Sequence, residues 1–324
     1  MKAIQVEDDD ENRMVWGEAP RPEISSDEVL VAVRATAVNR ADLLQRRGLY
    51  PPPEGASEIL GLEISGTIER VGESVDDWSP GDPVCALLPG GGYAEYASVP
   101  ADMLLPVPDQ LDLVEAAGIP EVFYTAFSNL RLEAEQSSGD RVLLHAAASG
   151  VGTAAIQICR LFDSPVFATA SRPKLPFLRE MGVECAIDRK REDFVEVVDE
   201  ATDGRGVDVI LDPVAGDYLP RNIEVLAPLG RLVVIGLLGG TKGTLPMGRL
   251  LRSRHRIIGS VLRSRSVEEK IEITNAFREE VWPHFATGEL RPIIDKRFPI
   301  REANEAHALI RSNETIGKVL LVMD

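Results

Sequence analysis

The stretch HAAASGVGTAA, residues 145–155, lies between an apolar run and a segment with helical periodicity. Dinucleotide-binding folds place the pattern G-x-G-x-x-G at such a junction. In this chain the three glycine positions hold Ala147, Ser149 and Gly152. Gly152 keeps the position at which helix and strand pack closely, and Gly150 adds backbone freedom beside Ser149. Small residues also begin ordinary helices, so the stretch alone leaves both interpretations open.

The surrounding pattern favours a nucleotide site. Apolar strand-like runs alternate with helical segments from about residue 141 onward, and helices are predicted from Gly150 to Phe162 and through Leu178 to Met181. This alternation is typical of parallel βαβ units and of a doubly wound sheet in an α/β protein. Six strands are predicted, in the order RVLLHAA, PVFATA, CAI, VDVILD, RLVVIG and RIIGSVL.

The first third of the chain has the texture of a β domain instead. In VLVAVRATAV, residues 29–38, every second residue from Val29 to Ala37 is apolar, which predicts a half-buried strand. After a helix predicted from Val267 to Phe285, the segments RPIIDKRFPI and GKVLLVM return to this texture. We therefore predict a β-barrel domain, residues 1–121 and 288–324, interrupted by a nucleotide-binding domain, residues 122–287.

The amino-acid composition limits the kinds of molecule that the protein is expected to bind. The 324 residues include 52 acidic and 35 basic side chains, a net charge of −17, which disfavours nucleic acid and anionic membranes. Three scattered cysteines, no signal-like start and no long apolar run predict a soluble, cytoplasmic protein without disulfides. The basic cluster from Arg249 to Arg265 is the exception. It fits a local patch, a solvated helix or the edge of a dimer.

The second predicted strand indicates which dinucleotide is bound. NAD-binding folds usually place a carboxylate about 20 residues after the glycine motif, where it bonds the ribose hydroxyls. Here the chain has Ser171, Arg172 and Lys174, with no acid before Glu180. Cations beside a small hydroxyl residue suit the 2′-phosphate of NADPH. The alternative is that these basic residues only solvate the start of a helix.

Several motifs together resemble a known family. They are AVNRADLLQRRGLYPPP, LGLEISGTIERVG, LLPGGGYAEYASVP, IPEVFYTAF and HAAASGVGTAAIQI. The chain is similar over its whole length to the zinc-independent quinone oxidoreductases of the medium-chain dehydrogenase/reductase superfamily. The similarity is greatest to the tumour-suppressor-inducible branch, and zeta-crystallin-like members are more distant. The resemblance implies a GroES-like barrel domain with an inserted Rossmann domain, an NADPH cofactor and a homodimer.

The resemblance also implies cofactor contacts. Lys174 and Arg189 match positions that contact the 2′-phosphate, with Ser171 beside them, and relatives often have Tyr at the place of Arg189. Thr125 and Ser128, taken to open the interdomain helix, are equally explained by helix packing. The remaining implied contacts are the pyrophosphate loop, Ser149, Gly150, Val151, Gly152 and Thr153, and the nicotinamide loop, Gly236, Leu237 and Leu238.

No metal is expected. Related alcohol dehydrogenases bind a catalytic zinc through a cysteine that would fall at Asn39 and a histidine that would fall at Leu62. Asn, Leu and the neighbouring acid Glu63 do not make a tetrahedral N/S site.

Without a metal, the substrate oxygen needs another partner. Tyr50 precedes Pro51, in a stiff loop, and its phenol can donate a hydrogen bond to a carbonyl at neutral pH. The resemblance places Asn39 and Asp42 in the same site. Asn39 is expected to bond ribose or substrate, and Asp42 to hold the loop, through Arg46 or Arg40. His145 is expected to be a satisfied histidine at a strand end.

We therefore expect an NADPH:quinone oxidoreductase that takes a small quinone or another conjugated carbonyl. One alternative is an NADPH-dependent enoyl-thioester or alkenal reductase, which carries Asn, Asp and Tyr at similar spacing. Another is a non-catalytic NADPH-sensing or RNA-binding protein like some zeta-crystallin relatives. The natural acceptor, and whether electrons pass singly or as hydride, stay open at this point.

Overall fold

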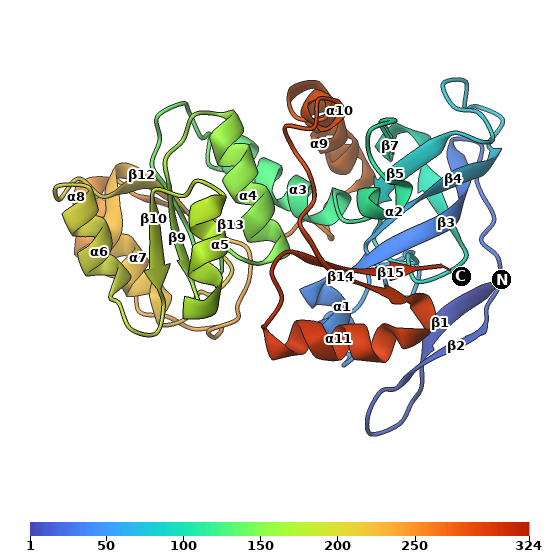
Figure 1. The fold of residues 1–324 in the computed structure, drawn as a ribbon, viewed down its shortest axis with the longest axis horizontal. Coiled ribbons are helices and arrows are strands. Elements are labelled where there is room, and N and C mark those ends of the chain that lie inside the picture. Colours follow the sequence, from blue (N-terminus) through green and yellow to red (C-terminus); the bar gives the residue numbers. More distant parts are fainter. Residues whose placement is uncertain (324) are drawn as a thin grey trace. The chain divides into compact units, whose positions relative to one another are not determined.

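A computed structural model of the chain describes residues 1–323. Its contacts divide the chain into two compact units. We call residues 1–124 with 262–323 the discontinuous unit, and Thr125–Val261 the inserted unit. The two ends of the chain both belong to the discontinuous unit (Figure 1). The predicted arrangement, one unit interrupting another, is confirmed.

The discontinuous unit is built on a sheet of seven strands. Its order is β14-β15-β3-β4-β5-β7, with β6 also paired to β3, and only β14 and β15 run parallel. The late strand β15 pairs with the early strand β3, as the tail segments predicted. The strands are β1 (Lys2–Val6) and β2 (Met14–Glu18), which form a separate pair, and β3 (Glu28–Val38), β4 (Glu63–Val71), β5 (Pro83–Leu87), β6 (Tyr96–Pro100), β7 (Leu104–Pro106), β14 (Ile294–Pro299) and β15 (Lys318–Val322).

Strand β3 is more buried than its sequence pattern predicts. The apolar face from Val29 to Ala37 is buried, but so are Leu30 and Thr36 on the opposite face. Strands β15, β4 and β6 all pair with β3, and helices α2 and α11 pack on it. The prediction of a half-buried strand is therefore wrong for most of its length, because alternation in sequence does not reveal a second covering layer.

Helices pack around this sheet, and one of them crosses the boundary between the two units. The helix predicted from Val267 to Phe285 is two helices, since Pro283 removes a backbone donor and the first helix ends at Glu280. The helices are α1 (Arg40–Gln45), α2 (Leu113–Ala116), α3 (Pro120–Phe127), which crosses the boundary, α9 (Val267–Glu280), α10 (Pro283–Ala286) and α11 (Ala303–Ser312), with 3-10 turns η1 (Ala101–Met103) and η4 (Ile300–Glu302).

Helices α9 and α10 belong to the discontinuous unit, although the sequence assigned them to the nucleotide domain. Their aromatic rings pack on the middle of α3. The ring centroids of Phe123 and Phe285 are 4.9 Å apart, and those of Tyr124 and Phe277 are 4.7 Å apart, both edge to face. The contacts thus put the second boundary after Val261 rather than after residue 287.

The inserted unit holds the predicted doubly wound sheet. All six predicted strands form, and all pair in parallel in the order β10-β9-β8-β11-β12-β13. Counted from β8, this is the Rossmann order 3-2-1-4-5-6. The strands are β8 (Val142–Leu144), β9 (Val166–Ala170), β10 (Cys185–Asp188), β11 (Val207–Asp212), β12 (Leu226–Val234) and β13 (Arg256–Gly259).

Helices cover both faces of this sheet. In Figure 1, α4 and α5 lie on one face, and α6, α7 and α8 lie on the other. Right-handed crossovers that move in opposite directions from β8 and β11 require this division. One core cluster joins Leu143, Phe167 and Ile210 of the strands to Ile223 of α7. The helical segments are η2 (Ser128–Glu133, a π-helix), α4 (Gly150–Leu161), η3 (Arg172–Lys174), α5 (Leu175–Glu180), α6 (Phe194–Ala201), α7 (Tyr218–Val225) and α8 (Met247–Ser253).

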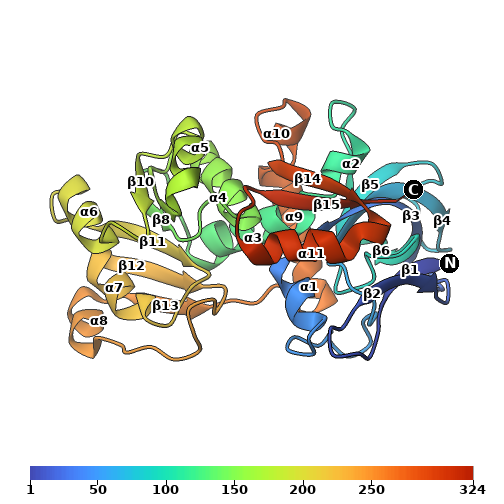
Figure 2. The ribbon, with the colours of Figure 1, turned by 60° about the horizontal axis from the view of Figure 1, so that its bottom comes forward.

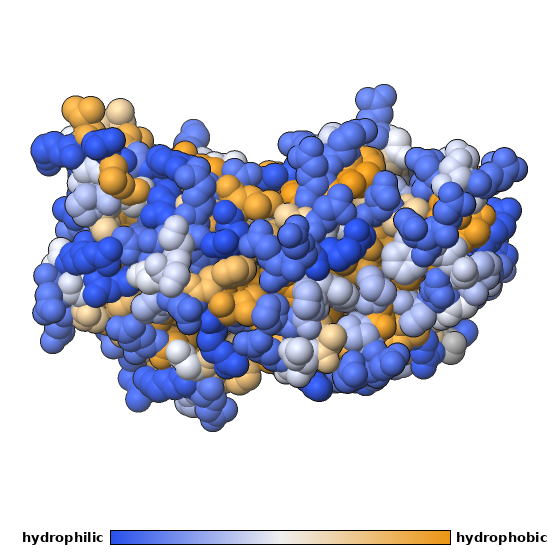
Figure 3. Space-filling view, turned by 90° about the horizontal axis from the view of Figure 1, so that it is seen from above, coloured by the Kyte–Doolittle hydropathy of each residue, from blue (hydrophilic) through white to orange (hydrophobic). Residues whose placement is uncertain are grey.

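The surface is mostly hydrophilic, with separate apolar groups (Figure 3). One group lies at the left-hand end in Figure 3, the end where Figures 1 and 2 draw α8. The exposed apolar side chains of α8 are Met247 and Leu251. Within residues 1–323, no helix is long and apolar enough to cross a membrane.

Candidate functional site

The tight turn between β8 and α4 contains one residue with a left-handed backbone conformation. That residue is Ala146, with φ of 51°, one position before the alanine that stands for the first glycine of the fingerprint. The amide N–H of Ala147 then donates to the carbonyl of Thr169 at the end of β9, 3.1 Å away. The tight turn is therefore made without glycine, by an alanine that accepts an unfavourable backbone conformation.

Gly152 is required by close packing, as the motif predicted. A Cβ atom at this position would lie 2.4 Å from the carbonyl oxygen of Ala147, a distance that real Cβ atoms do not reach. Ser149 is the N-cap of α4, and its hydroxyl accepts a hydrogen bond from the Gly152 amide at 3.1 Å. Thr153 donates its hydroxyl to the carbonyl of Gly150 at 3.0 Å and is buried.

These contacts leave a helix start whose first amides are suited to an anion. The first amides of a helix have no intrahelical partner, and here they belong to Gly150 and Val151. The positive end of the α4 dipole adds to them, so the turn is suited to a pyrophosphate. The Ser149 hydroxyl accepts from Gly152 but keeps its hydrogen, which can still be donated to a phosphate oxygen.

The residues predicted to hold the 2′-phosphate meet at the carboxyl edge of β9 and β10. The amide of Arg189 donates to the carbonyl of Ala170 at 3.0 Å, which places Arg189 directly beside Ser171. The amide of Lys174 donates to the carbonyl of Ser171 at 2.9 Å. No carboxylate occupies the end of β9, because Ser171 follows the last strand residue. Two cations and a hydroxyl thus share one corner.

The loop after β12 lies on the same edge of the sheet. The amide of Leu238 donates to the carbonyl of Pro213, which follows β11, at 3.2 Å. A Cβ at Gly236 would meet that same carbonyl oxygen at 2.9 Å. Leu237 and Leu238 are both exposed. The loops after β8, β11 and β12 therefore line the carboxyl edge at the switch point of the sheet, where open α/β folds bind ligands.

Two predicted cofactor residues, Thr125 and Ser128, have a different position from the one expected. They do not open the α-helix of this segment, since α3 begins at Pro120. Thr125 lies near the end of α3, where its carbonyl accepts from Asn129 at 2.7 Å, and Ser128 begins the π-helix η2. The Ser128 hydroxyl is buried and has no hydrogen-bond partner in residues 1–323.

His145 is held in a buried polar network, as expected for a satisfied strand-end histidine. Its two ring nitrogens lie 3.0 Å from the Thr169 hydroxyl and 2.8 Å from the Asn222 side-chain oxygen. Asn222 in turn donates to Asp212 at 2.8 Å. Burial lowers the pKa of His145, so the neutral ring is favoured.

In the discontinuous unit, Asp42 organises a loop, but not through arginine. Its carboxylate accepts the amide N–H of Asn39 at 2.7 Å, the amide of Gly61 at 3.2 Å and the Tyr93 hydroxyl at 3.2 Å. The predicted partners are wrong, because Arg46 bonds the carbonyl of Asn12 and Arg40 bonds Asn313. Burial raises the pKa of Asp42 to about 6, against the hydrogen bonds that lower it.

Asn39 is engaged by an ion pair that the sequence reasoning missed. The Lys318 ammonium lies 2.6 Å from the Asn39 side-chain oxygen and 2.7 Å from Glu63 Oε1, and all three residues are buried. The Asn39 amide also donates to Glu63 Oε1 at 2.8 Å. A lysine inside the apolar run GKVLLVM was the sequence signal for this pair. Among residues 1–323, no cluster of three His, Cys, Asp or Glu side chains is suited to a metal.

Tyr50 lies against a second buried cation, Arg263. The Arg263 guanidinium carbon is 5.3 Å from the centroid of the Tyr50 ring. Burial raises the pKa of this tyrosine, and so does the charge of the Glu121 carboxyl group, in the first turn of α3. Burial, and then the nearby Glu63, raise the pKa of Glu121 to about 8, which favours the protonated acid at neutral pH. Glu121 and Arg263 were not predicted as site residues, although Glu121 lies inside the motif IPEVFYTAF.

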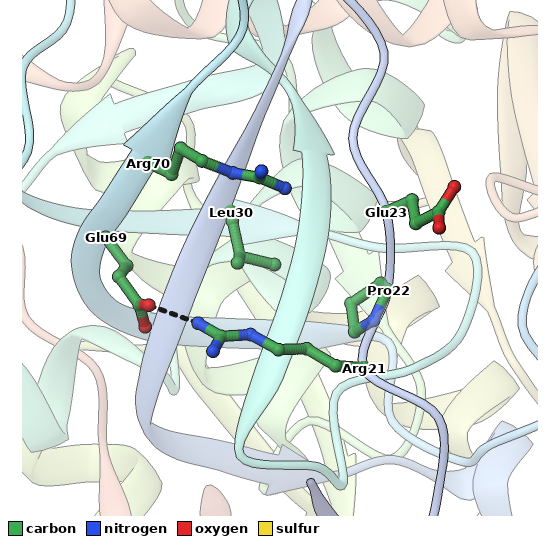
Figure 4. Close-up of a pocket in the computed structure, with 6 residues that line it drawn as sticks. All are labelled: Arg21, Pro22, Glu23, Leu30, Glu69 and Arg70. Carbon is green, nitrogen blue, oxygen red and sulfur yellow. Dashed lines mark hydrogen bonds and ion pairs between the residues drawn. The ribbon is translucent and has the colours of Figure 1, made fainter.

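A surface pocket of the discontinuous unit contains none of these residues (Figure 4). It is open, with a volume of about 360 Å³, and lies between the segment before β3 and strand β4. Arg21 pairs with Glu69 in its wall, and the Arg21 guanidinium stacks 3.8 Å from the centroid of the Tyr96 ring. We assign the pocket no role in the chemistry.

Comparison with known proteins identifies both units. Residues 25–109 match the family described as alcohol dehydrogenase GroES-like domain, and residues 150–278 match the family described as zinc-binding dehydrogenase. A synaptic vesicle membrane protein VAT-1 homolog from Mus musculus is 31% identical over 91% of this chain and 76% of its own length. A phenolphthiocerol/phthiocerol polyketide synthase protein from Mycobacterium tuberculosis is 30% identical over 94% of this chain, which spans only 14% of that protein.

Solved structures agree with these matches. A quinone oxidoreductase from Pseudomonas syringae pv. tomato DC3000 superposes with a TM-score of 0.88 at 26% identity, covering 99% of each chain. The CurK enoyl reductase superposes with a TM-score of 0.88 at 30% identity, covering 100% of this chain and 99% of its own. The chain belongs to the zinc-independent quinone oxidoreductase family of the medium-chain dehydrogenase/reductase superfamily.

Proposed function

We propose that this oxidoreductase uses NADPH to reduce quinones without a metal. The observation that carries the proposal is the corner at the carboxyl edge of β9 and β10, where Lys174 and Arg189 lie beside Ser171 and the end of β9, where NAD-binding folds place their carboxylate, holds Ser171 instead. NADPH would be held there by its 2′-phosphate, and by its pyrophosphate at the Gly150 and Val151 amides.

When bound, the cofactor supplies the hydride, and the protein supplies orientation and a proton. Tyr50 is proposed to donate its phenolic proton to the reduced carbonyl oxygen. Asn39 and Asp42 are proposed to act as positioning residues, because their polar groups are already bonded to Glu63, Lys318, the protein backbone and Tyr93. Leu237 and Leu238 are proposed to lie beside the nicotinamide, as the resemblance implies.

The cofactor assignment is tested with the double variant Lys174→Ala/Arg189→Ala. Each charged hydrogen bond to phosphate is worth about 1.5–3 kcal/mol, so we expect the Kd for NADPH to rise at least 10-fold. The Kd for NADH should change less than about 3-fold, because NADH has no 2′-phosphate. Calorimetric titration with both cofactors measures this, and an equal loss for both would overturn the NADPH assignment.

A second candidate function is reduction of an enoyl thioester. The similarity to the CurK enoyl reductase and to a polyketide synthase protein favours it. In that reaction Tyr50 would protonate the enolate carbon. NADPH oxidation is followed at 340 nm with 1,4-benzoquinone, 9,10-phenanthrenequinone and crotonyl-CoA. Turnover of quinones supports our first proposal, and turnover of the thioester alone would replace it by the second.

We also propose that the protein is a homodimer. Strand β13 forms one edge of the six-stranded sheet, and no strand in residues 1–323 pairs with its outer side. Ile257 in this strand is exposed, and so are Val261 and Leu251 nearby in sequence. An unpaired edge with apolar side chains is suited to antiparallel pairing with a second copy about a two-fold axis.

A further inference from the structure

Arg263 is buried against three separate loops of the discontinuous unit. Only 5% of its surface is exposed. Its Nε donates to the carbonyl of Pro89 at 2.7 Å, its Nη2 to the side-chain oxygen of Gln45 at 2.7 Å, and its Nη1 to the carbonyl of Tyr50 at 3.3 Å. One guanidinium thus fixes the end of α1, the Tyr50 loop and the loop after β5.

All three acceptors are neutral. The guanidinium makes no ion pair with a carboxylate in residues 1–323. Arg263 is 5% exposed, and this burial lowers its pKa because the charge is poorly solvated. Asp42 and Glu121 interact with it only through longer-range electrostatic attraction, which raises its pKa. Because no bonded carboxylate neutralises this buried cation, its charge can stabilise an anion that forms beside it.

Tyr50 is the ionisable group whose ring lies against the guanidinium. Its half-buried ring lies 5.3 Å from the guanidinium carbon, measured to the ring centroid. Burial and the carboxyl group of Glu121 raise the pKa of Tyr50, and Arg263 lowers it. Lys270 completes the charged set, because its ammonium donates to the carbonyl of Arg263 at 2.8 Å and also lies near Glu121.

We propose that Arg263 is a positioning residue that orients the Tyr50 loop and stabilises the Tyr50 phenolate formed during turnover. This rests on the proposed function. In the balanced step, NADPH, when bound, would supply a hydride to the quinone, and the O–H bond of Tyr50 would break as its proton moves to the reduced oxygen. NADP⁺, hydroquinone and the Tyr50 phenolate result. The phenolate then takes a proton from water, so the net reaction consumes one solvent proton.

The first test measures Tyr50 without turnover. Fluorotyrosine is placed at position 50 in the full chain, and its ionisation is followed by ¹⁹F NMR in three backgrounds: wild type, Arg263→Met and Arg263→Lys. We expect ionisation to move to higher pH in Arg263→Met and to stay near the wild-type value in Arg263→Lys, which keeps the charge. An unchanged midpoint in Arg263→Met would overturn the proposal.

The second test measures catalysis. Arg263→Met is expected to lower kcat at least 10-fold with little change in KM for NADPH, because the residue acts on the proton donor. Free guanidinium should restore part of the kcat of Arg263→Ala. Arg278→Lys is the matched control, because Arg278 also donates to a backbone carbonyl, that of Leu104 at 2.8 Å, but binds a different segment from the Tyr50 loop.

The two tests separate the inference from the function on which it rests. If no acceptor is turned over but the Tyr50 midpoint moves as expected, the pairing of Arg263 with Tyr50 stands and the reductase assignment fails. If quinones are reduced at the same rate by wild type and Arg263→Met, the proposed role of Arg263 fails and the reductase assignment stands. Arg263→Gln, which also removes the charge, replaces Arg263→Met in both tests if Arg263→Met does not fold.

Discussion

At the scale of single residues, the site of the discontinuous unit is defined by charges placed where the chain is otherwise apolar. Lys318 and Glu63 are almost fully buried and lie 2.7 Å apart, and Asn39 bridges them. A buried charge without its partner is strongly destabilising, so each of the two is needed by the other. Asn39, at the position where the resemblance implies a zinc-ligating cysteine in alcohol dehydrogenases, is therefore part of this buried network.

Glu121 gives a pH-dependent prediction. Its pKa is raised from 4.5 to about 8 by burial and by Glu63, so the folded protein retains a proton that the unfolded chain releases. This contribution to stability is complete below pH 4.5 and is lost as the pH rises through about 8. We expect the free energy of unfolding of Glu121→Gln to rise relative to that of wild type as the pH rises. The difference should be on the order of 1 kcal/mol at pH 8.5, once the partial exposure of Glu121 is considered.

The measurement is urea unfolding of both proteins at pH 5.5 and pH 8.5. The pKa of Asp42 is also raised, to about 6, but Asp42 is present in both proteins and cancels in the difference. Glu272→Gln, at an exposed position of α9, is the control and should show no such gain. A constant difference between Glu121→Gln and wild type across this range would contradict the prediction.

Single charged residues are also where the sequence was least informative. Tyr50 could be singled out because prolines follow it, and Asn39 because it replaces a known ligand. The partners of Asp42 could not be predicted, because its carboxylate bonds two backbone amides and Tyr93, which lies 51 residues away. Hydrogen bonds to the backbone leave no signature in residue type.

At the scale of elements, the turn between β8 and α4 combines two opposite backbone requirements. Ala146 adopts a left-handed conformation that suits glycine, and Gly152 has no room for a side chain. We expect Ala146→Gly to stabilise the protein by about 1 kcal/mol, by relieving the cost of positive φ. We expect Gly152→Ala to destabilise it by about 1–3 kcal/mol and to weaken NADPH binding, because the helix must move away from Ala147.

Thermal unfolding and calorimetric NADPH titration measure these effects. Gly248→Ala in α8 is the control, since the nearest atom to its added methyl group is the flexible end of Arg252, 3.3 Å away. It should be neutral or stabilising, because alanine is a better helix former than glycine. If Gly152→Ala behaves like Gly248→Ala, the close packing of α4 on the turn is not what requires glycine.

Elements were also what the sequence predicted best. All six strands of the inserted unit, and the return of the last segments to the first sheet, follow from apolar runs bounded by glycine and proline. The failures have physical causes. The single helix predicted from Val267 to Phe285 is divided near Pro283. Thr125 lies late in α3, whose start at Pro120 was not recognised, and Ser128 follows the end of that helix as the first residue of η2. Long apolar segments do not reveal where backbone hydrogen bonding is interrupted.

At the scale of the whole molecule, the net charge opposes the association of two copies, whereas the edge of the six-stranded sheet favours it. A charge of −17 opposes association of two copies. Strand β13 is basic and apolar instead, with Arg256 bonded to Glu135 and Ile257 39% exposed. The basic cluster noted in the sequence is thus partly neutralised by neighbouring acids and partly structural, since Arg263 is buried. What remains at this edge is suited to another copy of the same strand better than to a polyanion.

Association through β13 therefore gives the last prediction. Light scattering should find twice the chain mass of 35.3 kDa, and the double variant Ile257→Glu/Val261→Glu should shift the mass towards that of one chain. Two carboxylates facing their own copies across a two-fold axis would repel and would be desolvated on pairing, which costs more than the apolar contact provides. NADPH binding should persist in the variant, because the cofactor residues lie at the ends of other strands. Val6→Glu, an exposed apolar residue of β1, is the control and should remain dimeric. A wild-type protein that is monomeric at high concentration, or a variant that stays dimeric, would show that β13 is not the interface.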